Sequence, residues 1–341
     1  MSRAVAFVVV VFVSGLTARL WAQAVEPPLI DARTTQAVQT GLTWLATRQQ
    51  PDGTFGTSAY RRNPAVVSFC ATALLSSGST PGRGPYGVHL QRSIEQIISC
   101  AQPDGYLIDP EANYYHAPMY GHGFGTLFLG EVYGLSPRDE VGDVLRRAVK
   151  LIVATQNAEG GWRYAPEPKE ADVSVTACMA TALRSARNAG ISVPKETIDH
   201  CIEYLKRCQT VDGGFRYRSL EAAESAFPRS AAAVVALSAC GVTDGETLEN
   251  GRRYCADYLT GVAFRRDPEH LFYGCYYAAG AAKFAGNEQW RRHFPLIRDR
   301  LLERQTREGY WVDDAVGKEY ATALALIVLQ LPGEALPIFQ R

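Results

Sequence analysis

The stretch Gln156-Asn157-Ala158-Glu159-Gly160-Gly161-Trp162 recurs along the chain with its key residues at the same spacing. Each copy reads Gln-x-x-acid-Gly-x-aromatic: acid and glycine make a turn, the glutamine can bond backbone at a helix end, and the aromatic can pack between helical hairpins. A shifted copy is Gln102-Pro103-Asp104-Gly105. The glutamine, acid and glycine of the four full copies are Gln49, Asp52, Gly53; Gln156, Glu159, Gly160; Gln209, Asp212, Gly213; and Gln305, Glu308, Gly309.

A second series of glycines gives the same period. Glycine just past a helix commonly takes the left-handed conformation that closes the helix C-terminus. Six such glycines, one at the end of each apolar segment, predict six repeats of about 50 residues. They are Gly78, Gly134, Gly190, Gly241, Gly286 and Gly333.

Two kinds of helix alternate around these turns. Segments before a turn are amphipathic, as in 141–155, where apolar residues recur at helical spacing. Segments after a turn, such as 173–189, 230–240 and 320–331, are apolar nearly all round and rich in alanine, which is typical of buried helices. The pattern predicts an all-α fold, an α/α toroid of six helical hairpins with an outer amphipathic ring and an inner alanine-rich ring. An open superhelix is the alternative.

The N-terminus has the features of an export signal. A basic start is followed by an apolar run and by Ala22-Gln23-Ala24, which predicts a signal peptide over 1–24 and one toroid domain over 25–341. The apolar run is about 13 residues, short of the roughly 20 that span a membrane, and no later segment is long enough. We therefore expect a periplasmic or extracellular protein. Lys and Arg number 35 and so do Asp and Glu, a balance that gives no indication of nucleic-acid binding.

The repeated turns resemble the prenyltransferase/squalene oxidase repeat of squalene cyclases and protein prenyltransferase β subunits. The segment from Gly160 to Tyr164 and the sequence Asp172-Val173-Ser174-Val175-Thr176-Ala177 are especially similar to that family. The resemblance covers nearly the whole chain after residue 24. It implies a toroid with a central cavity that opens where the inner helices begin.

The residues that carry the family's chemistry are only partly present. Terpene cyclases have Asp-x-Asp-Asp-Thr-Ala, whose middle aspartate is the acid; here that position is Ser174, and Asp172 is the surviving carboxylate. Protein prenyltransferases bind zinc through a histidine where this chain has Tyr273. We therefore expect no metal and no cofactor. Asp172 is the one candidate catalytic residue, with helix capping as its structural alternative.

Loops that lead into the inner helices supply the candidate ligand site. Six helix N-termini would point at this end, where they favour anions, and aromatic side chains with converging polar groups are typical of binding sites. The candidate cavity residues are His116, Tyr120, His122, Trp162, Arg163, Arg216, Arg229, Tyr273 and Glu319.

Three functions fit this pattern. The first is an isoprenoid-like, hydrophobic or amphipathic ligand bound in the cavity, with or without a terpene cyclase/mutase-like or transferase-like reaction. The second is a carbohydrate-active enzyme of the polysaccharide lyase or glycosidase kind, since toroids also occur among those and arginines with aromatics suit anionic sugars. The third is a non-catalytic binding or scaffold module. Protein partners are not indicated by the sequence.

Overall fold

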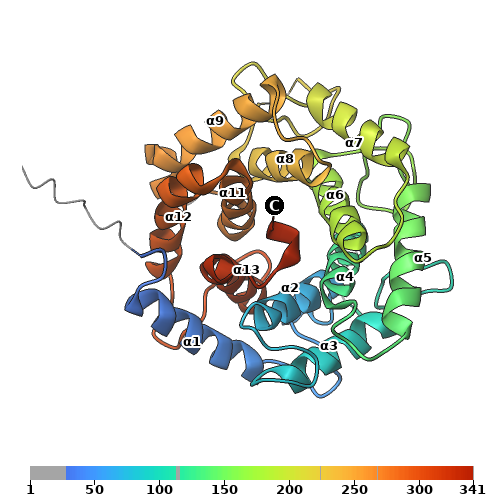
Figure 1. Ribbon diagram of the computed structural model, residues 1–341, viewed down its shortest axis with the longest axis vertical. Coiled ribbons are helices and arrows are strands. Elements are labelled where there is room, and N and C mark those ends of the chain that lie inside the picture. The colour runs from blue at the N-terminus through green and yellow to red at the C-terminus, as the bar shows by residue number, and fades with distance from the viewer. Residues whose placement is uncertain (1–27, 113–115, 223, 267, 341) are drawn as a thin grey trace, which may run out of the picture.

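A computed structural model describes residues 28–112, 116–222, 224–266 and 268–340. The signal peptide predicted over 1–24 lies outside these residues. In the described part every extended regular element is a helix, and β-pairing is limited to isolated bridges. Figure 1 shows the helices arranged as two concentric rings around a central axis. This confirms the predicted α/α toroid.

In the described ranges, six amphipathic helices form the outer ring and six mostly buried helices form the inner ring, an arrangement that can be followed in Figure 1. Along the chain an outer helix precedes each inner helix, as the repeat pattern predicted. The outer helices are α1 (Ala32–Thr47), α3 (Gly87–Ser99), α5 (Glu140–Ala154), α7 (Lys195–Arg207), α9 (Glu246–Thr260) and α12 (Asn287–Leu302). The inner helices are α2 (Pro64–Leu75), α4 (Pro118–Val132), α6 (Val173–Asn188), α8 (Phe227–Ala239), α11 (Leu271–Ala285) and α13 (Lys318–Gln330).

Both rings close on themselves. Each inner helix packs against the next, and the last inner helix, α13, packs against the first, α2. In the outer ring α12 contacts α1. The chain is therefore a closed ring, not an open superhelix. One short helix, α10 (Val262–Arg265), lies in the fifth repeat at the point where the sequence has lost its turn motif.

Small residues allow the inner helices to approach closely. A β-carbon placed on Gly123 of α4 would lie 2.5 Å from Sγ of Cys178 on α6. One placed on Gly130 would lie 2.4 Å from Oγ of Ser185. Larger residues at these positions would force the two helices apart. The abundance of glycine and alanine in the inner ring is thus a packing requirement.

The repeated glutamine fastens each hairpin to the next outer helix. Nε2 of Gln156 donates to the carbonyl of Gly160 in its own turn at 2.8 Å and to the carbonyl of Thr197 on α7 at 2.9 Å. Gln209 makes the same pair of bonds, to Gly213 and to Thr247 on α9. The turn glycine is required because Gly160 has φ +96° and a β-carbon there would lie 2.2 Å from a backbone oxygen of α7.

The aromatic residue of the turn packs between the rings. The indole nitrogens of Trp162 and Trp311 donate to the carbonyls of Ile152 and Leu301, each at 2.7 Å. Both tryptophans are fully buried. Their role is structural, as expected for the turn motif.

Five of the six predicted helix-ending glycines adopt a positive φ, and Gly333 does not. Gly78, Gly134, Gly190, Gly241 and Gly286 have φ between 83° and 110°. Gly333 ends a 3₁₀ turn, η2 (Leu331–Gly333), and Glu334 takes the left-handed conformation at φ 55°. The prediction was wrong at Gly333 because α13 ends in a turn that redirects the chain.

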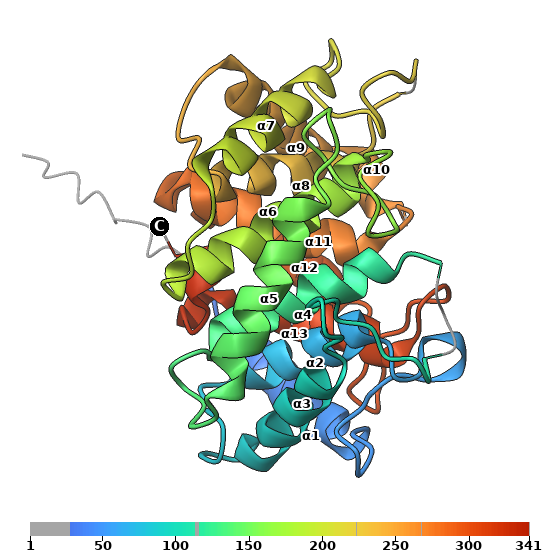
Figure 2. The same cartoon turned by 90° about the vertical axis from the view of Figure 1, so that its right-hand side faces the viewer.

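The C-terminal tail, defined as residues 331–340, re-enters the ring after that turn. Its second 3₁₀ element, η3 (Pro337–Phe339), contacts α6 and α11. The C-terminus lies at the centre of the ring in Figure 1 and, in Figure 2, on the face opposite the long loops that lead into the inner helices. The tail therefore closes one end of the inner barrel.

Candidate functional site: a cavity at the open end of the inner barrel

A cavity of about 670 Å³ lies at the end of the barrel where the inner helices begin. Its walls include residues at the starts of all six inner helices. These are Asn63 (α2), Ala117 (α4), Ser174 (α6), Phe227 (α8), Tyr273 (α11) and Tyr320 (α13). The cavity is therefore where the resemblance implied it would be. Its volume is in the range of pockets that hold small organic ligands.

Aromatic side chains dominate the cavity wall. Phe69 of α2 and Phe124 of the neighbouring helix α4 contact each other, with ring centroids 4.2 Å apart, and Tyr120 stacks on Phe124. Rings of this kind bury much apolar surface and give a ligand flat faces to pack against. The aromatic lining residues are Tyr60, Phe69, Tyr120, Phe124, Tyr164, Tyr217, Phe227, Tyr254, Tyr258, Tyr273 and Tyr320.

Polar groups at the starts of several inner helices join this wall. Arg229 is held by two backbone carbonyls, those of Phe215 (3.0 Å) and Glu224 (2.7 Å), and its guanidinium lies over the ring of Tyr217. The His116 ring contacts Tyr164 with centroids 5.2 Å apart. Glu269 and His270 also line the cavity. The cavity thus combines aromatic surface with a few groups that can bind a polar head.

Asp172 caps α6 and lies outside the set of cavity-lining residues. Its Oδ1 accepts from the backbone N–H of Val175 at 2.9 Å, and its side chain is fully buried. Among the described residues no group lies within normal hydrogen-bonding distance and angle of Oδ2. Burial raises the pKa of this carboxyl to about 6, although the Val175 bond, the nearby Arg163 charge and the nearby Tyr217 hydroxyl oppose that shift. Capping explains an aspartate here, and the carboxyl is a buried acid close to the cavity tyrosines.

Two cavity tyrosines, Tyr164 and Tyr217, contact each other through their hydroxyl groups. The hydroxyls of Tyr164 and Tyr217 lie 2.5 Å apart, joining the loops before α6 and α8. Both phenols line the cavity, and burial, followed by the Asp172 charge, raises the pKa of Tyr217. The Tyr217 phenol is therefore a neutral hydrogen-bonding group at neutral pH.

Four of the nine predicted cavity residues line the cavity: His116, Tyr120, Arg229 and Tyr273. His122 does not. Its Nδ1 accepts from the backbone N–H of Leu107 at 3.1 Å, and its Nε2 lies 3.2 Å from the carbonyl of Ala148 on α5. Burial lowers the pKa of His122 to about 4, so it is a neutral structural link between α4 and the outer ring.

Trp162 and Glu319 are also buried away from the cavity. The prediction of Trp162 as a cavity residue was wrong, because its ring fills the space between α5 and the inner ring. Glu319 is 2% exposed; it pairs with Arg48 at 3.2 Å and accepts from Thr57 at 3.2 Å. Both groups hold elements of the wall together.

Arg163 and Arg216 lie in the loops at the open end but do not line the cavity. Arg163 pairs with Glu170 at 2.5 Å and lies over the ring of Tyr164. Arg216 donates to backbone carbonyls of Glu221 and Gln209 at 3.3 and 3.4 Å. Both guanidinium groups bind to other residues of these loops and so stabilise the loop conformations.

Sequence reasoning missed the deeper residues. Phe69, Phe124 and Tyr320 were outside the candidate set because it was drawn from loops. The sequence contained a signal for them. A large aromatic residue in an inner helix of otherwise small residues is a candidate to face the barrel axis.

The sequence matches the prenyltransferase alpha-alpha toroid domain model over residues 10–102 and 91–277, and the chain belongs to that family. The fold is similar to the type II terpene cyclase MstE from Scytonema, at 15% identity over 91% of this chain and 100% of that chain, with a TM-score of 0.61. A variant of MstE in complex with geranylgeranyl dihydroxybenzoate, its substrate, matches at 15% identity, 89% and 98% coverage and TM-score 0.60.

Other toroids match equally well. The solved structure of a glycosidase variant is 11% identical over 90% of this chain and 100% of that chain, with a TM-score of 0.62. Identities this low establish the fold alone. No curated protein sequence matches the chain. In the part that the structure describes, no group of three His, Cys, Asp or Glu side chains could hold a metal ion, and no helix is long and apolar enough to cross a membrane.

Proposed function

We propose that the protein binds an isoprenoid or a similar amphipathic ligand in the cavity at the open end of the inner barrel. The observation that carries this proposal is the shape and lining of the cavity: about 670 Å³, with eleven phenylalanine and tyrosine side chains in its wall, Phe69 and Phe124 in contact with each other, and Arg229 beside them in the lining. An apolar chain would pack on the rings, and a hydroxyl or anionic head would meet Arg229 and His116.

The family and the MstE structure with its isoprenoid-derived substrate support this choice of ligand class. The proposal is for binding. Asp172 is a buried acid near the cavity tyrosines, and its capping bond to Val175 accounts for its position without a reaction step.

The test uses the full chain made by export from a bacterial host and freed of endogenous lipid. Native mass spectrometry after incubation with farnesol or geranylgeraniol measures retained mass. We expect one molecule retained, and its loss in Ser174→Trp, which fills the cavity from the start of α6. Val88→Trp places the same indole side chain at an exposed position of α3 and should retain ligand.

Equal retention by Ser174→Trp and the wild type would place the ligand elsewhere and contradict the proposal. So would the absence of any retained isoprenoid. Retention of an acidic oligosaccharide in place of the isoprenoid would favour a carbohydrate function for the same cavity.

A further inference from the structure

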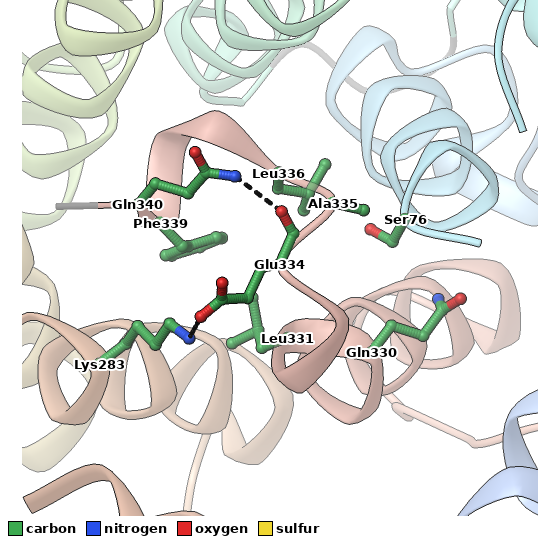
Figure 3. Close-up of a pocket in the computed structure, with 9 residues that line it drawn as sticks. All are labelled: Ser76, Lys283, Gln330, Leu331, Glu334, Ala335, Leu336, Phe339 and Gln340. Carbon is green, nitrogen blue, oxygen red and sulfur yellow. Dashed lines mark hydrogen bonds and ion pairs between the residues drawn. The ribbon is translucent and has the colours of Figure 1, made fainter. Parts of the chain in front are cut away.

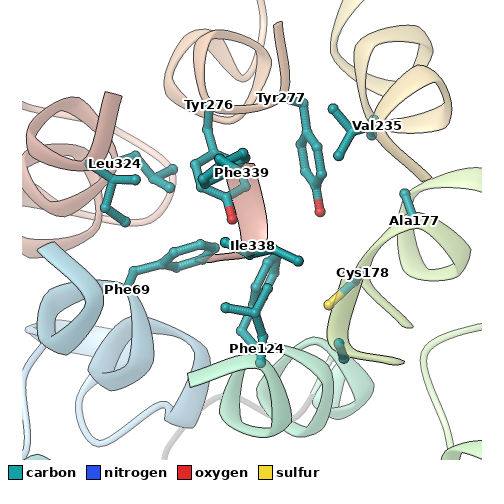
Figure 4. Packing of buried hydrophobic residues seen from close by; sticks show 14 of the residues in the cluster. Phe69, Phe124, Ala177, Cys178, Val235, Tyr276, Tyr277, Leu324, Ile338 and Phe339 are labelled. Atoms are coloured by element: carbon teal, nitrogen blue, oxygen red, sulfur yellow. The ribbon is translucent and has the colours of Figure 1, made fainter. Parts of the chain in front are cut away.

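The C-terminal tail occupies the far half of the barrel with apolar side chains. Phe339 packs against Tyr276 of α11, with ring centroids 5.5 Å apart, and its ring fills the space beside Gly280, where a β-carbon would come within 2.8 Å of it. Ile338 and Phe339 are 2% and 3% exposed. Figure 4 shows both side chains among rings contributed by the surrounding inner helices, at the centre of the barrel.

Polar contacts hold the tail in this position at three points. The backbone N–H of Ile338 donates to Oε2 of Glu131 on α4 at 3.3 Å. Arg184 on α6 donates to the carbonyl of Gln340 at 2.7 Å. Lys283 on α11 pairs with Glu334 at 2.7 Å (Figure 3). The tail is thus fastened to three inner helices.

The tail packs closely against the surrounding inner helices. The gap that remains beside it, lined by Ser76, Lys283 and Leu336 among others, has a volume of about 10 Å³, the space of a single water molecule (Figure 3). Glu131 also accepts from Ser185 at 2.8 Å, so the carboxylate that meets the tail is itself fixed. The tail behaves as part of the barrel core.

A continuous set of rings connects the tail to the cavity. Phe69 lines the cavity base, its ring lies 5.8 Å from that of Tyr276, and Tyr276 in turn contacts Phe339. Between the cavity base and the tail there is therefore one layer of aromatic side chains, and the tail is the next layer. Every group in this column is apolar or aromatic.

We propose that Ile338 and Phe339 are the depth stop of the ligand cavity and set the length of the apolar chain that it accepts. This inference rests on the proposed function and narrows it to the shorter isoprenoids. A longer chain would have to extend past Phe69 and Phe124 into the space that the tail fills. Because the tail belongs to the same chain and is fixed at three points, the ligand must displace buried side chains to gain that depth.

The experiment compares ligand length in the double variant Ile338→Ala/Phe339→Ala and in the wild type. Purified full-length protein is offered farnesol, geranylgeraniol and squalene in competition, and native mass spectrometry gives the ratio bound. We expect the wild type to prefer the shorter alcohols. The double variant should shift the squalene-to-farnesol ratio toward squalene by about tenfold or more, since each added methylene that becomes buried strengthens binding.

Leu336→Ala is the control, because Leu336 is buried to the same degree in the same tail but lies beside the gap at the far face. It should leave the ratio unchanged. If the double variant fails to fold, the single change Phe339→Leu, which removes less volume, should shift the ratio in the same direction by a smaller factor.

An unchanged ratio in a folded variant, or a wild type that already prefers squalene, would overturn the depth stop while leaving isoprenoid binding intact. Failure of every protein to retain any of the three probes would overturn the proposed function and the depth stop together. The two results are therefore distinguishable.

Discussion

Nε2 of Gln305 donates to the carbonyl of Ala37 at 2.9 Å, and this bond joins the last repeat to the first across 268 residues of sequence. The same side chain donates to Gly309 in its own turn at 2.8 Å. Gln156 makes the equivalent bonds within the ring, to Gly160 and Thr197. The contact between the last and the first repeat is thus built like the contacts between the other repeats. One short repeated motif therefore both spaces the hairpins and closes the ring.

Replacing the seam glutamine tests ring closure. Gln305→Ala removes the bonds to Ala37 and Gly309, together with a longer one to Oγ1 of Thr40, and should lower the free energy of unfolding by about 1–2 kcal/mol. Gln156→Ala, which removes the matched pair inside the ring, should cost the same. Urea denaturation measures both. If the ring were open between the last and the first repeat in solution, Gln156→Ala would lower the free energy of unfolding and Gln305→Ala would not.

Two substitutions of Asp172 distinguish a helix-capping role from a role as an acid. Asp172→Ala loses the bond to Val175 and should lower stability by about 1 kcal/mol, whereas Asp172→Asn keeps a favoured capping residue and should stay within a few tenths of the wild type. Thermal unfolding measures both variants. We expect Asp172→Asn to retain isoprenoid as the wild type does. A folded Asp172→Asn protein that binds ligand but leaves it unaltered, where the wild type converts it, would instead assign the carboxyl a chemical role.

The repeat could be predicted from the sequence because its signals are local. Acid-glycine turns, helix-ending glycines and alternating helix types each depend on a few neighbouring residues, and α6 and α8 begin and end within three residues of the predicted segments. The cavity was harder, because whether a residue faces the axis depends on helix rotation. His122 and Tyr120 are two residues apart, yet Tyr120 lines the cavity and His122 links α4 to the outer ring.

The tail was not predictable from local signals. Gly333 continued the glycine series, but nothing in Pro337-Ile338-Phe339 indicates that this short segment returns to the barrel axis. Its partner Glu131 lies more than 200 residues earlier in the sequence, and the pairing depends on the closed ring. A buried glutamate in an otherwise apolar inner helix was the one available clue.

Glu131 should make stability depend on pH. Burial raises the pKa of Glu131 to about 7 from its ordinary value of 4.5, against the bond from Ser185. The folded protein therefore binds more protons than the unfolded chain between these values, and the contribution of Glu131 to stability is full below pH 4.5 and is lost as pH rises to about 7. Glu131→Gln should remove roughly 1–3 kcal/mol of this pH dependence. Identical pH profiles of thermal unfolding for the two proteins would contradict this account.

The contact between α4 and α6 should tolerate no added bulk. Gly130→Ala would place a β-carbon 2.4 Å from Oγ of Ser185 and should destabilise the protein by about 1–3 kcal/mol. Gly121→Ala is the control on the same helix, since its β-carbon would meet Pro64 at an ordinary 3.4 Å. That variant should be neutral or slightly more stable, because alanine favours the helix. Equal effects of the two changes in chemical denaturation would show that close packing at Gly130 is unimportant.

The most direct test of the central claim is to locate the ligand. A farnesyl photoprobe carrying a diazirine is bound, irradiated and mapped by peptide mass spectrometry. The account predicts label on segments that line the inner-barrel cavity, such as 63–69, 117–124 and 225–229. Label confined to the surface groove between α7 and α9, lined by Lys195 and Thr247 among others, would contradict it.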